Sequence, residues 1–574
     1  MQIIESYNFF FKIISKKDKY YLFYLTIYSL FISILEFLTI AMLYPLILSF
    51  QGLDKNVDFF TKINLYFKKY LNLDLVNDQI ISLVLILVVL FFLVFNLFNI
   101  HYLFRTGLFW SRIKAQIQQK VFIYYTEMNY LDLLNINNAS VLKNINFEAK
   151  RFIDHFIAPI FIIISKIFVI IFLIAGIAYI EPKLTIYLLL LLIFYYSLIY
   201  NILKIIAKKN SHSLSEQYER TTKIIDETTN NFIFLKIFNL LGIYNLRLKE
   251  STDKMNKLEA VNNIISQIPR YVLETFFFLV GIFFIFFIFK ENLFFFYLPV
   301  LILIFIVFLK IAPAFQMIYS LYISIKSHYS SGDSLADILL SKYYRKDLSD
   351  QSPKILTTQI SIIDIKNLSF KYQNKTDYII NNLNLKFEKD SIYGIEGYSG
   401  SGKTTLINII IGLISDYKGD VFINNINLKE ISNVEWFSKI AIIPQNIFIS
   451  EDTVLNNITL NNSILNSYDK DKLDFVLKRS GLSEFVNNLD QGINSLIVNN
   501  AKLISGGEKQ RLAIARALYK EAQVLIFDEP VNNLDHSNII LFMKMLQEIK
   551  NEKIIIIIAH QKEVIANCDI IYKI

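Results

Sequence analysis

The sequence predicts a membrane domain of six long α-helices followed by a soluble α/β domain. Hydrophobic residues make up 54% of the 574 residues, and before about residue 325 they form runs too long for the core helices of a soluble protein. From residue 360 onward, short β-branched runs alternate with helical stretches and turn residues, which is typical of a parallel-sheet α/β domain. The chain is therefore expected to be a multi-pass membrane protein with a soluble second half.

Six apolar runs are long enough to cross a bilayer. They lie near residues 20–50, 79–105, 156–180, 184–206, 271–290 and 293–325. Two connections, 106–155 and 207–267, are long, charged and helix-prone, with basic residues beside the spans. Basic residues also precede the first span, so the positive-inside rule places the N-terminus and both connections in the cytoplasm.

These features divide the chain into a transmembrane domain over 1–330, a polar linker over 331–359 and a soluble domain over 360–574. Residues 59–73 carry an apolar stripe opposite their lysines, which predicts an amphipathic helix on the outer membrane surface. A loop helix that merely covers the span ends fits that pattern equally well. The net charge of +8 is explained by lysines beside the spans, and the soluble half has no basic and aromatic patch, so no nucleic-acid binding is expected.

A glycine-rich loop, GYSGSGKTT (397–405), joins the strand-like SIYGIE to an apolar helix. Glycines let successive backbone N–H groups close around phosphates, and a helix N-terminus favours their negative charge. In such a P-loop, Lys403 reaches the β- and γ-phosphates and the Thr404 hydroxyl holds Mg²⁺. The loop therefore predicts binding of a nucleoside triphosphate with Mg²⁺.

A second motif, VLIFDEP, is an apolar strand that ends in two carboxylates, Asp528 and Glu529. Downstream of a P-loop, this pattern predicts that Asp528 holds Mg²⁺ through water and that Glu529 polarises the attacking water. A solvated acidic turn is the alternative, and the apolar strand argues against it.

Between these motifs, ISGGEKQRLAIARAL (504–518) resembles the signature sequence of ATP-binding cassette (ABC) proteins. Other motifs of that family follow in order. Tyr372 in LSFKY resembles the aromatic residue that stacks on adenine, and Gln445 in IIPQN resembles the Q-loop glutamine that senses Mg²⁺. Asp535 in NNLD resembles the D-loop aspartate, and His560 resembles the switch histidine that contacts the γ-phosphate.

The resemblance covers the whole chain and implies a half-size ABC exporter, an ATPase that works as a homodimer with ATP and Mg²⁺. Each ATP would lie between two cassettes, because the signature serine and glycines meet the γ-phosphate bound by the opposite subunit; a heterodimer with a related chain stays open. The implied catalytic residues are Glu529, His560 and Gln445, and the implied metal ligands are Thr404, Gln445 and Asp528. The implied nucleotide-binding residues are Tyr372, Gly397, Tyr398, Ser399, Gly400, Ser401, Gly402, Lys403, Thr404, Thr405, Ser505, Gly506, Gly507, Glu508 and Asp535.

The match to the family pattern has departures. Ile504 and Glu508 stand where the signature has Leu and Gln, and Asn532 and Asn533 replace the usual Ser-Ala of the D-loop. The stretch SLIVNNAK (495–502) lacks the glycine-acidic-x-glycine pattern common in exporters. The catalytic groups are all present, so two competent ATP sites per homodimer are expected.

Glu36 in SILEFLTIAMLYPLI, NNFIFLKIFN (230–239) and IPRYVLE (268–274) resemble one exporter subgroup, which includes bacterial flippases for lipid-linked oligosaccharides and transporters associated with surface polysaccharides. This resemblance implies a flippase for an anionic lipid-linked glycan or another lipid, among membrane lipids in the bacterial cytoplasmic (inner) membrane, with the cassette in the cytoplasm. One alternative is an exporter of peptides or drugs. Another is an ATP-gated regulator that transports nothing, although the intact Glu529 favours ATP turnover over such a switch.

Two basic residues are candidates for contact with such a substrate, Arg270 in the fifth span and Lys310 in the sixth. An ammonium group near the bilayer midplane costs about 2.5–3.5 kcal/mol on insertion scales. One interpretation is structural: Lys310 reaches water by snorkelling, and Arg270 pairs with Glu274 one turn along its helix. In the other, both cations attract an anionic headgroup, such as a lipid-linked diphosphate, into an inward-open cavity.

Overall fold

The computed structural model of the chain forms two compact units. One unit comprises Met1–Met128 and Asn135–Asp347, and the other comprises Asn129–Leu134 and Leu348–Ile574. The structure describes residues 3–43, 77–180, 182–183, 185–186, 213–290, 294–328, 330–340, 359–372, 377–398, 400–460, 468–497, 504–530 and 536–574. The predicted outer helix over 59–73 and nearly all of the predicted span 184–206 lie outside these ranges.

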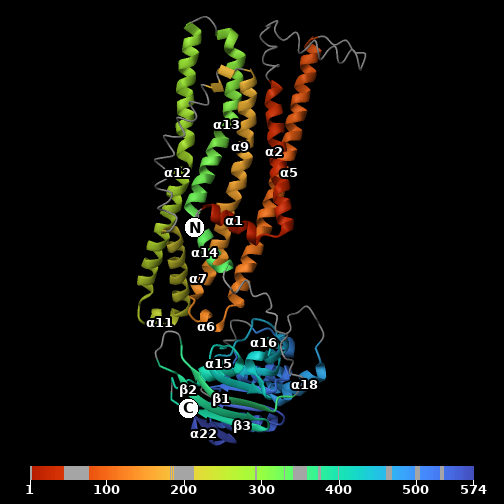
Figure 1. Ribbon diagram of the computed structural model, residues 1–574, viewed down its shortest axis with the longest axis vertical. Helices are drawn as coiled ribbons and strands as arrows, with labels where there is room; N and C mark the ends of the chain where they lie inside the picture. Colours follow the sequence, from red (N-terminus) through yellow and green to blue (C-terminus); the bar gives the residue numbers. More distant parts are fainter. Residues whose placement is uncertain are drawn as a thin grey trace. The chain divides into compact units, whose positions relative to one another are not determined.

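Long helices build the first unit (Figure 1). Over the residues described, four segments are long and apolar enough to cross a membrane: Lys16–Ala41, Ser82–Thr126, Asn138–Tyr179 and Leu301–His328. The predicted fifth span forms the C-terminal part of a fifth long helix, α12. The helices are α1 (Ile3–Ile13), α2 (Lys16–Ala41), α5 (Asn77–Thr126), α7 (Asn138–Lys143), α8 (Ala149–Arg151), α9 (Ala158–Ile180), α11 (Phe232–Ile237), α12 (Leu241–Lys290), α13 (Phe294–His328) and α14 (Ser330–Leu339), and residues 213–230 are also helical.

The membrane helices pack through apolar faces. Helix α2 packs against α5 and α9, and α13 packs against α9 and α12. Leu173 of α9 and Val307 of α13 belong to one buried cluster between these helices. Burial of such side chains from lipid or water gives each helix a preferred face.

The predicted linker over 331–359 needs a correction. Its first part is the helix α14, whose Leu335, Ala336 and Leu339 are buried with Phe10 of α1 and Ile113 of α5. Because this apolar face packs into the first unit, the helix continues beyond the expected boundary. Residues 341–358 lie outside the described part of the chain.

The segment from 138 to 180 is helical throughout but contains two π-helical turns. These are η2 (Asn144–Glu148) and η3 (Phe152–Ile157), separated by the single turn of α8. π-helical turns are rare and commonly occur at functional sites. They lie in the connection that the sequence assigns to the cytoplasm.

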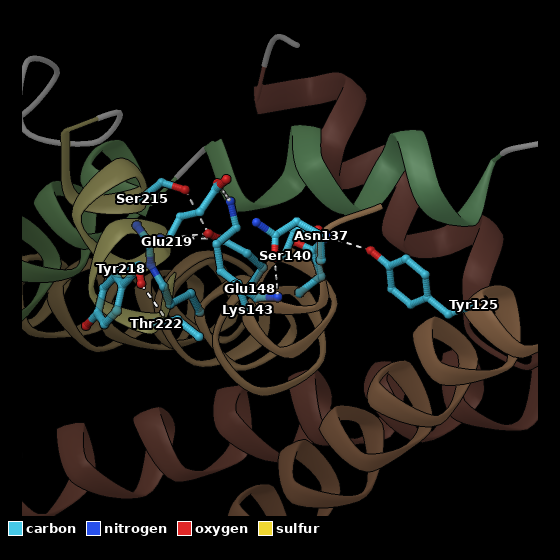
Figure 2. A network of polar contacts seen from close by, with 12 residues as sticks. Tyr125, Asn137, Ser140, Lys143, Glu148, Ser215, Tyr218, Glu219 and Thr222 are labelled. Atoms are coloured by element: carbon cyan, nitrogen blue, oxygen red, sulfur yellow. Dashed lines mark hydrogen bonds and ion pairs between the residues drawn. The ribbon is translucent and has the colours of Figure 1, made fainter. Parts of the chain in front are cut away.

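A polar network joins these π turns to the helix over 213–230 (Figure 2). Glu148 is fully buried, and its Oε1 accepts a hydrogen bond of 2.8 Å from Ser215 and lies 3.2 Å from Nη1 of Arg151. Lys143 forms an ion pair of 2.8 Å with Glu219. The Glu148–Arg151 pair is buried on both sides, so it is stable only while both charges are present, because either one alone lacks water and a counter-charge.

The same helix contacts α12. The Tyr218 hydroxyl donates a hydrogen bond of 2.5 Å to Glu259 Oε1. Burial and this hydrogen bond to Glu259 raise the pKa of Tyr218 to about 12, so the hydroxyl keeps its proton near neutral pH.

In its described residues, the second unit contains two sheets. A five-stranded sheet has the order β6-β7-β8-β3-β9, with every pair parallel, which confirms the predicted parallel α/β domain. A four-stranded antiparallel sheet, order β2-β1-β4-β5, was not predicted. The strands are β1 (Ile362–Phe370), β2 (Ile380–Glu388), β3 (Ser391–Glu396), β4 (Lys418–Ile423), β5 (Ile426–Asn427), β6 (Ile440–Ile443), β7 (Val524–Asp528), β8 (Ile554–Ile558) and β9 (Ile570–Lys573).

Helices and a core on each side cover the parallel sheet. The five isoleucines of β8 are all buried, as expected for a central strand of a parallel sheet. Tyr130 and Leu131 of the short helix α6 (Tyr130–Leu133) pack against one of the two cores. The other helices are α15 (Lys403–Ile411), α16 (Asn433–Lys439), α17 (Val454–Thr459), α18 (Lys470–Arg479), α19 (Ser483–Asn487), α20 (Gly506–Tyr519), α21 (His536–Ile549) and α22 (Lys562–Ala566).

Candidate active site

The predicted catalytic residues meet at one edge of the parallel sheet. Gln445 lies just after β6, Asp528 ends β7 and Glu529 follows it, His560 lies just after β8, and the glycine-rich loop follows β3. These four strands are neighbours, and the carboxyl ends of parallel strands lie at the same edge, where ligands bind in open α/β sheets. Sequence order alone separates these residues by more than 150 positions, and the sheet brings them together.

The P-loop is folded around the Lys403 side chain. Its Nζ donates hydrogen bonds to the carbonyl oxygens of Gly397 at 2.7 Å and Tyr398 at 2.8 Å. Gly402 has a φ of +100°, and a Cβ there would lie 2.9 Å from Ile379 Cγ2. At Gly397 a Cβ would lie 2.4 Å from the backbone oxygen of Ile574. Only glycine fits both positions, and the loop they shape can hold backbone N–H groups toward an anion.

The rest of the loop adds polar groups. Among the residues that the structure describes, the buried Ser401 hydroxyl has no hydrogen-bond partner. Gly400 has a φ of +86°, and Thr404 is exposed at the start of α15, where a hydroxyl could reach a ligand. Ser399 lies outside the described residues.

Tyr372 lies beside the start of α15. Its hydroxyl is 3.2 Å from the Thr405 hydroxyl, and its ring meets Phe370 edge-on at 5.0 Å. The predicted adenine-stacking residue is therefore close to the P-loop helix. This location is compatible with a base bound next to the phosphates.

Glu529 is held between two of the predicted catalytic residues. Its Oε2 accepts a hydrogen bond of 3.1 Å from Nε2 of Gln445, and its Oε1 lies 3.2 Å from Nε2 of His560. Glu529 also has a φ of +50°, and its backbone N–H donates to the Ile558 oxygen at 3.0 Å. A non-glycine residue in this region is strained, and such strain concentrates at functional sites.

Asp528 lies next to this group. Burial raises the pKa of its carboxyl above the usual range, Glu529 raises it further, and Lys403 acts in the opposite direction. The two carboxyls and the lysine are therefore close enough to interact. A divalent cation beside Asp528 would compensate the charge that burial disfavours.

Ser505 and Glu508 form a capping box at the start of α20. The Ser505 hydroxyl accepts from the Glu508 N–H at 3.3 Å, and Glu508 Oε2 accepts from the Ser505 N–H at 2.8 Å. Glu508, expected at the nucleotide, thus fixes the end of its own helix. Gly506 lines a cavity of about 250 Å³ together with Gln445 and Glu529. Asp535 is not among the described residues.

These residues fit ATP with Mg²⁺. Apart from its chain neighbours, no described atom lies within 4 Å of where a Cβ would stand at Gly400, and Ser401 and Lys403 supply donors in the loop. Within the described ranges no group of three or more His, Cys, Asp or Glu could hold a metal alone. Mg²⁺ in nucleotide sites needs only one or two protein ligands besides phosphate oxygens, so Thr404 and Asp528 suit it.

The two basic residues predicted to contact the substrate each pair with a different carboxylate. The Arg270 Nε donates a hydrogen bond of 2.6 Å to Glu274 on the same helix, α12. Lys310 forms an ion pair of 3.5 Å with Glu36 of α2. The sequence predicts the pairing of Arg270 with Glu274 as one interpretation, but it does not predict that Lys310 pairs with Glu36. The missed signal was an acid and a base that each interrupt an apolar run.

Comparisons with known proteins agree with this geometry. Residues 380–532 match a family model described as ABC transporter. Over 248 residues the chain is 29% identical to the ATP-dependent lipid A-core flippase of Wigglesworthia glossinidia brevipalpis, which covers 43% of this chain and 42% of that protein. The protein of the same name from Haemophilus influenzae (strain 86-028NP) is 31% identical over 207 residues, 36% of this chain and 35% of that protein. The matched region thus spans about two fifths of the length of these curated relatives.

A solved structure extends the comparison to the whole chain. A bacterial Atm1-family ABC exporter with ATP bound has a similar fold, with a TM-score of 0.74 and 17% sequence identity. The match covers 94% of this chain and 93% of that one. Both units described above are therefore part of the shared fold.

Proposed function

Because this chain carries an ATP-binding cassette of the ABC transporter family and has the fold of an ABC exporter half-transporter, we propose that it hydrolyses ATP to drive export across a membrane. The observation that carries the proposal is the position of Glu529 between Gln445 and His560, beside Asp528 and the P-loop. A protein that used nucleotide only as a switch would not need a carboxylate fixed at this place. The arrangement supports turnover.

Each side chain has a role that follows from its contacts. Glu529 is the group to accept the proton of the attacking water, and Gln445 and His560 orient its two oxygens. Lys403 provides a positive charge where the loop closes on phosphates. Mg²⁺, when bound, would neutralise the developing charge on the phosphate oxygens. Thr404 and Asp528 would hold it.

The signature residues support a homodimer. Ser505 and Gly506 start α20, whose N-terminus carries a partial positive charge that attracts phosphate. In the proposed assembly this end of α20 contacts the ATP that is bound to the P-loop of the second chain. Each of the two ATP sites is then built from both cassettes. A related chain in the second position would make the same contacts.

For the substrate we propose a lipid, most specifically an anionic lipid-linked glycan, moved between the leaflets of the bacterial cytoplasmic membrane. The names of the two flippase relatives support the lipid class. The basic residues before the first span support a cytoplasmic cassette. The N-terminus and both long connections would then share that side.

Reconstitution into proteoliposomes tests the proposal. Fluorescent anionic lipid and lipid-linked glycan should move between leaflets with added Mg-ATP and stay in place with the Glu529→Gln variant. ATP hydrolysis without movement of any lipid would contradict the flippase and favour an exporter of peptides or drugs, or a regulator. Absence of ATP hydrolysis in the wild-type protein would contradict the whole proposal.

A further inference from the structure

A cavity of about 470 Å³ lies within the membrane unit, and α2, α5, α9 and α13 line it. Its lining includes a carboxylate and two ammonium groups far apart in the sequence, Glu36, Lys166 and Lys310, besides the side-chain amides of Asn96 and Asn99. Apolar and aromatic side chains, including Phe95 and Trp110, line other parts of it. The cavity is therefore amphipathic, with a charged part inside helices that are otherwise apolar.

The charges in this cavity do not balance. Lys310 is paired with Glu36 at 3.5 Å, and the Glu36 side chain is only 15% exposed. Lys166 has no ion-pair partner in the part of the chain that the structure describes. The lining thus carries two ammonium groups and one carboxylate, which leaves one positive charge in excess. An unpaired cation inside membrane helices is costly and marks a functional site.

Several neutral donors of the cavity are already used. The hydroxyls of Ser29 and Ser33 donate to carbonyl oxygens of their own helix at 2.8 Å, and the hydroxyl of Thr106 donates to Tyr102 O at 2.9 Å. The ammonium groups of Lys166 and Lys310 are the charged donors in the lining. Ammonium groups bind phosphate through charge-assisted hydrogen bonds, which are stronger than neutral ones.

We propose that this cavity binds the phosphate group of an anionic lipid, with Lys166 as its main contact and Lys310 as the second. Lys310 reaches the phosphate by exchanging Glu36 for it, while the apolar wall contacts the adjoining part of the lipid. This inference rests on the proposed lipid transport and assigns its headgroup site. Lys166 thus takes the place of Arg270 as a candidate substrate contact, because Arg270 is paired on α12 and does not line the cavity.

Binding measured without nucleotide tests the site apart from transport. The probes are dioleoylphosphatidic acid, the zwitterionic dioleoylphosphatidylcholine and soluble glycerol phosphate, titrated into the full-length protein in detergent. Lys166→Gln should weaken binding of phosphatidic acid about tenfold, as expected when one charge-assisted hydrogen bond is lost. Binding of phosphatidylcholine should change much less.

The ion pair gives a prediction of opposite sign. Glu36→Gln leaves Lys310 unpaired and should tighten binding of phosphatidic acid several-fold, whereas Lys310→Gln should weaken it. The double variant Glu36→Gln/Lys310→Gln restores the original net charge and should return most of the way to wild type. A purely structural role of these residues would not produce tighter binding in any variant.

Matched controls lie on the same helices. Lys326→Gln removes a lysine of α13 that is not in the cavity lining and stands beside Tyr322, and Arg270→Gln removes the cation of α12. Both should bind phosphatidic acid as the wild type does. Unchanged affinity in Lys166→Gln, or an equal loss in Arg270→Gln, would overturn the assignment.

The soluble probe separates a lipid from a free phosphate compound. If glycerol phosphate binds as tightly as phosphatidic acid and depends on Lys166 equally, the occupant is a soluble phosphate and the lipid assignment is wrong. ATP-driven lipid transport that persists in Lys166→Gln proteoliposomes with unaltered lipid binding refutes the site and leaves the transport proposal standing. Lys166-dependent lipid binding without any ATP-driven movement of lipid supports the site and contradicts the transport proposal.

Discussion

The side-chain amide of Gln445 donates a hydrogen bond of 3.1 Å to Oε2 of Glu529, which joins the loop after β6 to the carboxylate that directly follows β7. Both residues line one cavity with Gly506 at the start of α20. Displacement of Gln445 must therefore change either the position or the hydrogen bonding of the proposed catalytic carboxylate. The first prediction addresses that carboxylate.

Glu529→Gln should lower ATP hydrolysis at least about a hundredfold, since general-base catalysis contributes about 10²–10⁴. ATP binding should persist, because the P-loop is untouched. Steady-state hydrolysis and binding of a fluorescent ATP analogue check both parts. Glu484→Gln, an exposed residue of α19, is the control and should behave as wild type. Full activity of the Glu529 variant would show that another group acts as the base.

Asp528→Asn should stabilise the protein without nucleotide at neutral pH by a few degrees in Tm. Burial, reinforced by Glu529, raises the pKa of Asp528 in the folded state, with Lys403 opposing. A carboxyl with a raised pKa destabilises the fold above that pKa, and the effect disappears as the pH falls to the usual carboxyl range. The Tm difference should thus shrink on acidification.

Two comparisons support this test. Mg-ATP should stabilise Asp528→Asn less than the wild type, because the proposed metal ligand has gone. Asp490→Asn, on the cassette surface, should leave the pH profile of Tm unaltered. A lower Tm for Asp528→Asn at neutral pH would contradict the argument.

Arg516→Lys should destabilise the cassette by about 2–4 kcal/mol, since hydrogen bonds to charged groups contribute about 1.5–3 kcal/mol each. The Arg516 guanidinium donates at 2.5 Å to the Asn457 carbonyl, at 2.6 Å to its side-chain oxygen, and also to the Phe448 carbonyl. Lysine keeps the charge but cannot reproduce this planar set of donors. Chemical denaturation measures the loss.

Arg511→Lys on the same helix is the matched control, because within the described residues Arg511 makes one such bond, 3.2 Å to the Gly481 carbonyl. Its loss of stability should be clearly smaller. Equal losses in the two variants would mean that helix propensity or charge determines the loss of stability, and that the geometry of the guanidinium contacts does not.

Glu148→Gln should destabilise the membrane unit by about 3–5 kcal/mol, because it leaves the buried Arg151 without its counter-charge. Thermal unfolding in detergent should show a clear fall in Tm. The double variant Glu148→Gln/Arg151→Met removes both charges and should recover most of the loss. A double variant no more stable than the single one would refute an electrostatic origin.

Local patterns predicted the cassette well. The P-loop, the strand before Asp528 and Glu529, and the ordered family motifs each occupy a few consecutive residues, and a parallel sheet then necessarily brings them to one edge. The role of Glu508 was also visible in principle, since Ser505 and Glu508 have the spacing of a capping box. Resemblance to the family instead suggested a ligand contact.

The membrane contacts were harder to predict. Glu36 and Lys310 are distant in the sequence, and only helix packing decides that α2 and α13 present them to each other. Lys166 lies within a predicted span, but its importance depends on a cavity made by four helices. The two π turns have no evident sequence pattern at all. Long-range pairing and backbone irregularity thus account for what the sequence did not reveal.

The π turns before α9 decide where a change in chain length reaches Lys166. An α-helix turns about 100° per residue and rises about 1.5 Å. A π turn bonds residues five apart and so holds one residue more than the α turn it replaces. Deleting one residue of η3 (Phe152–Ile157) in a way that restores regular α-helix would therefore be absorbed locally, and Lys166 would keep its direction relative to the network around Glu148. Deleting one residue of regular helix between Ala158 and Lys166 would instead rotate Lys166 by about 100° away from the cavity, although no cavity residue had been replaced.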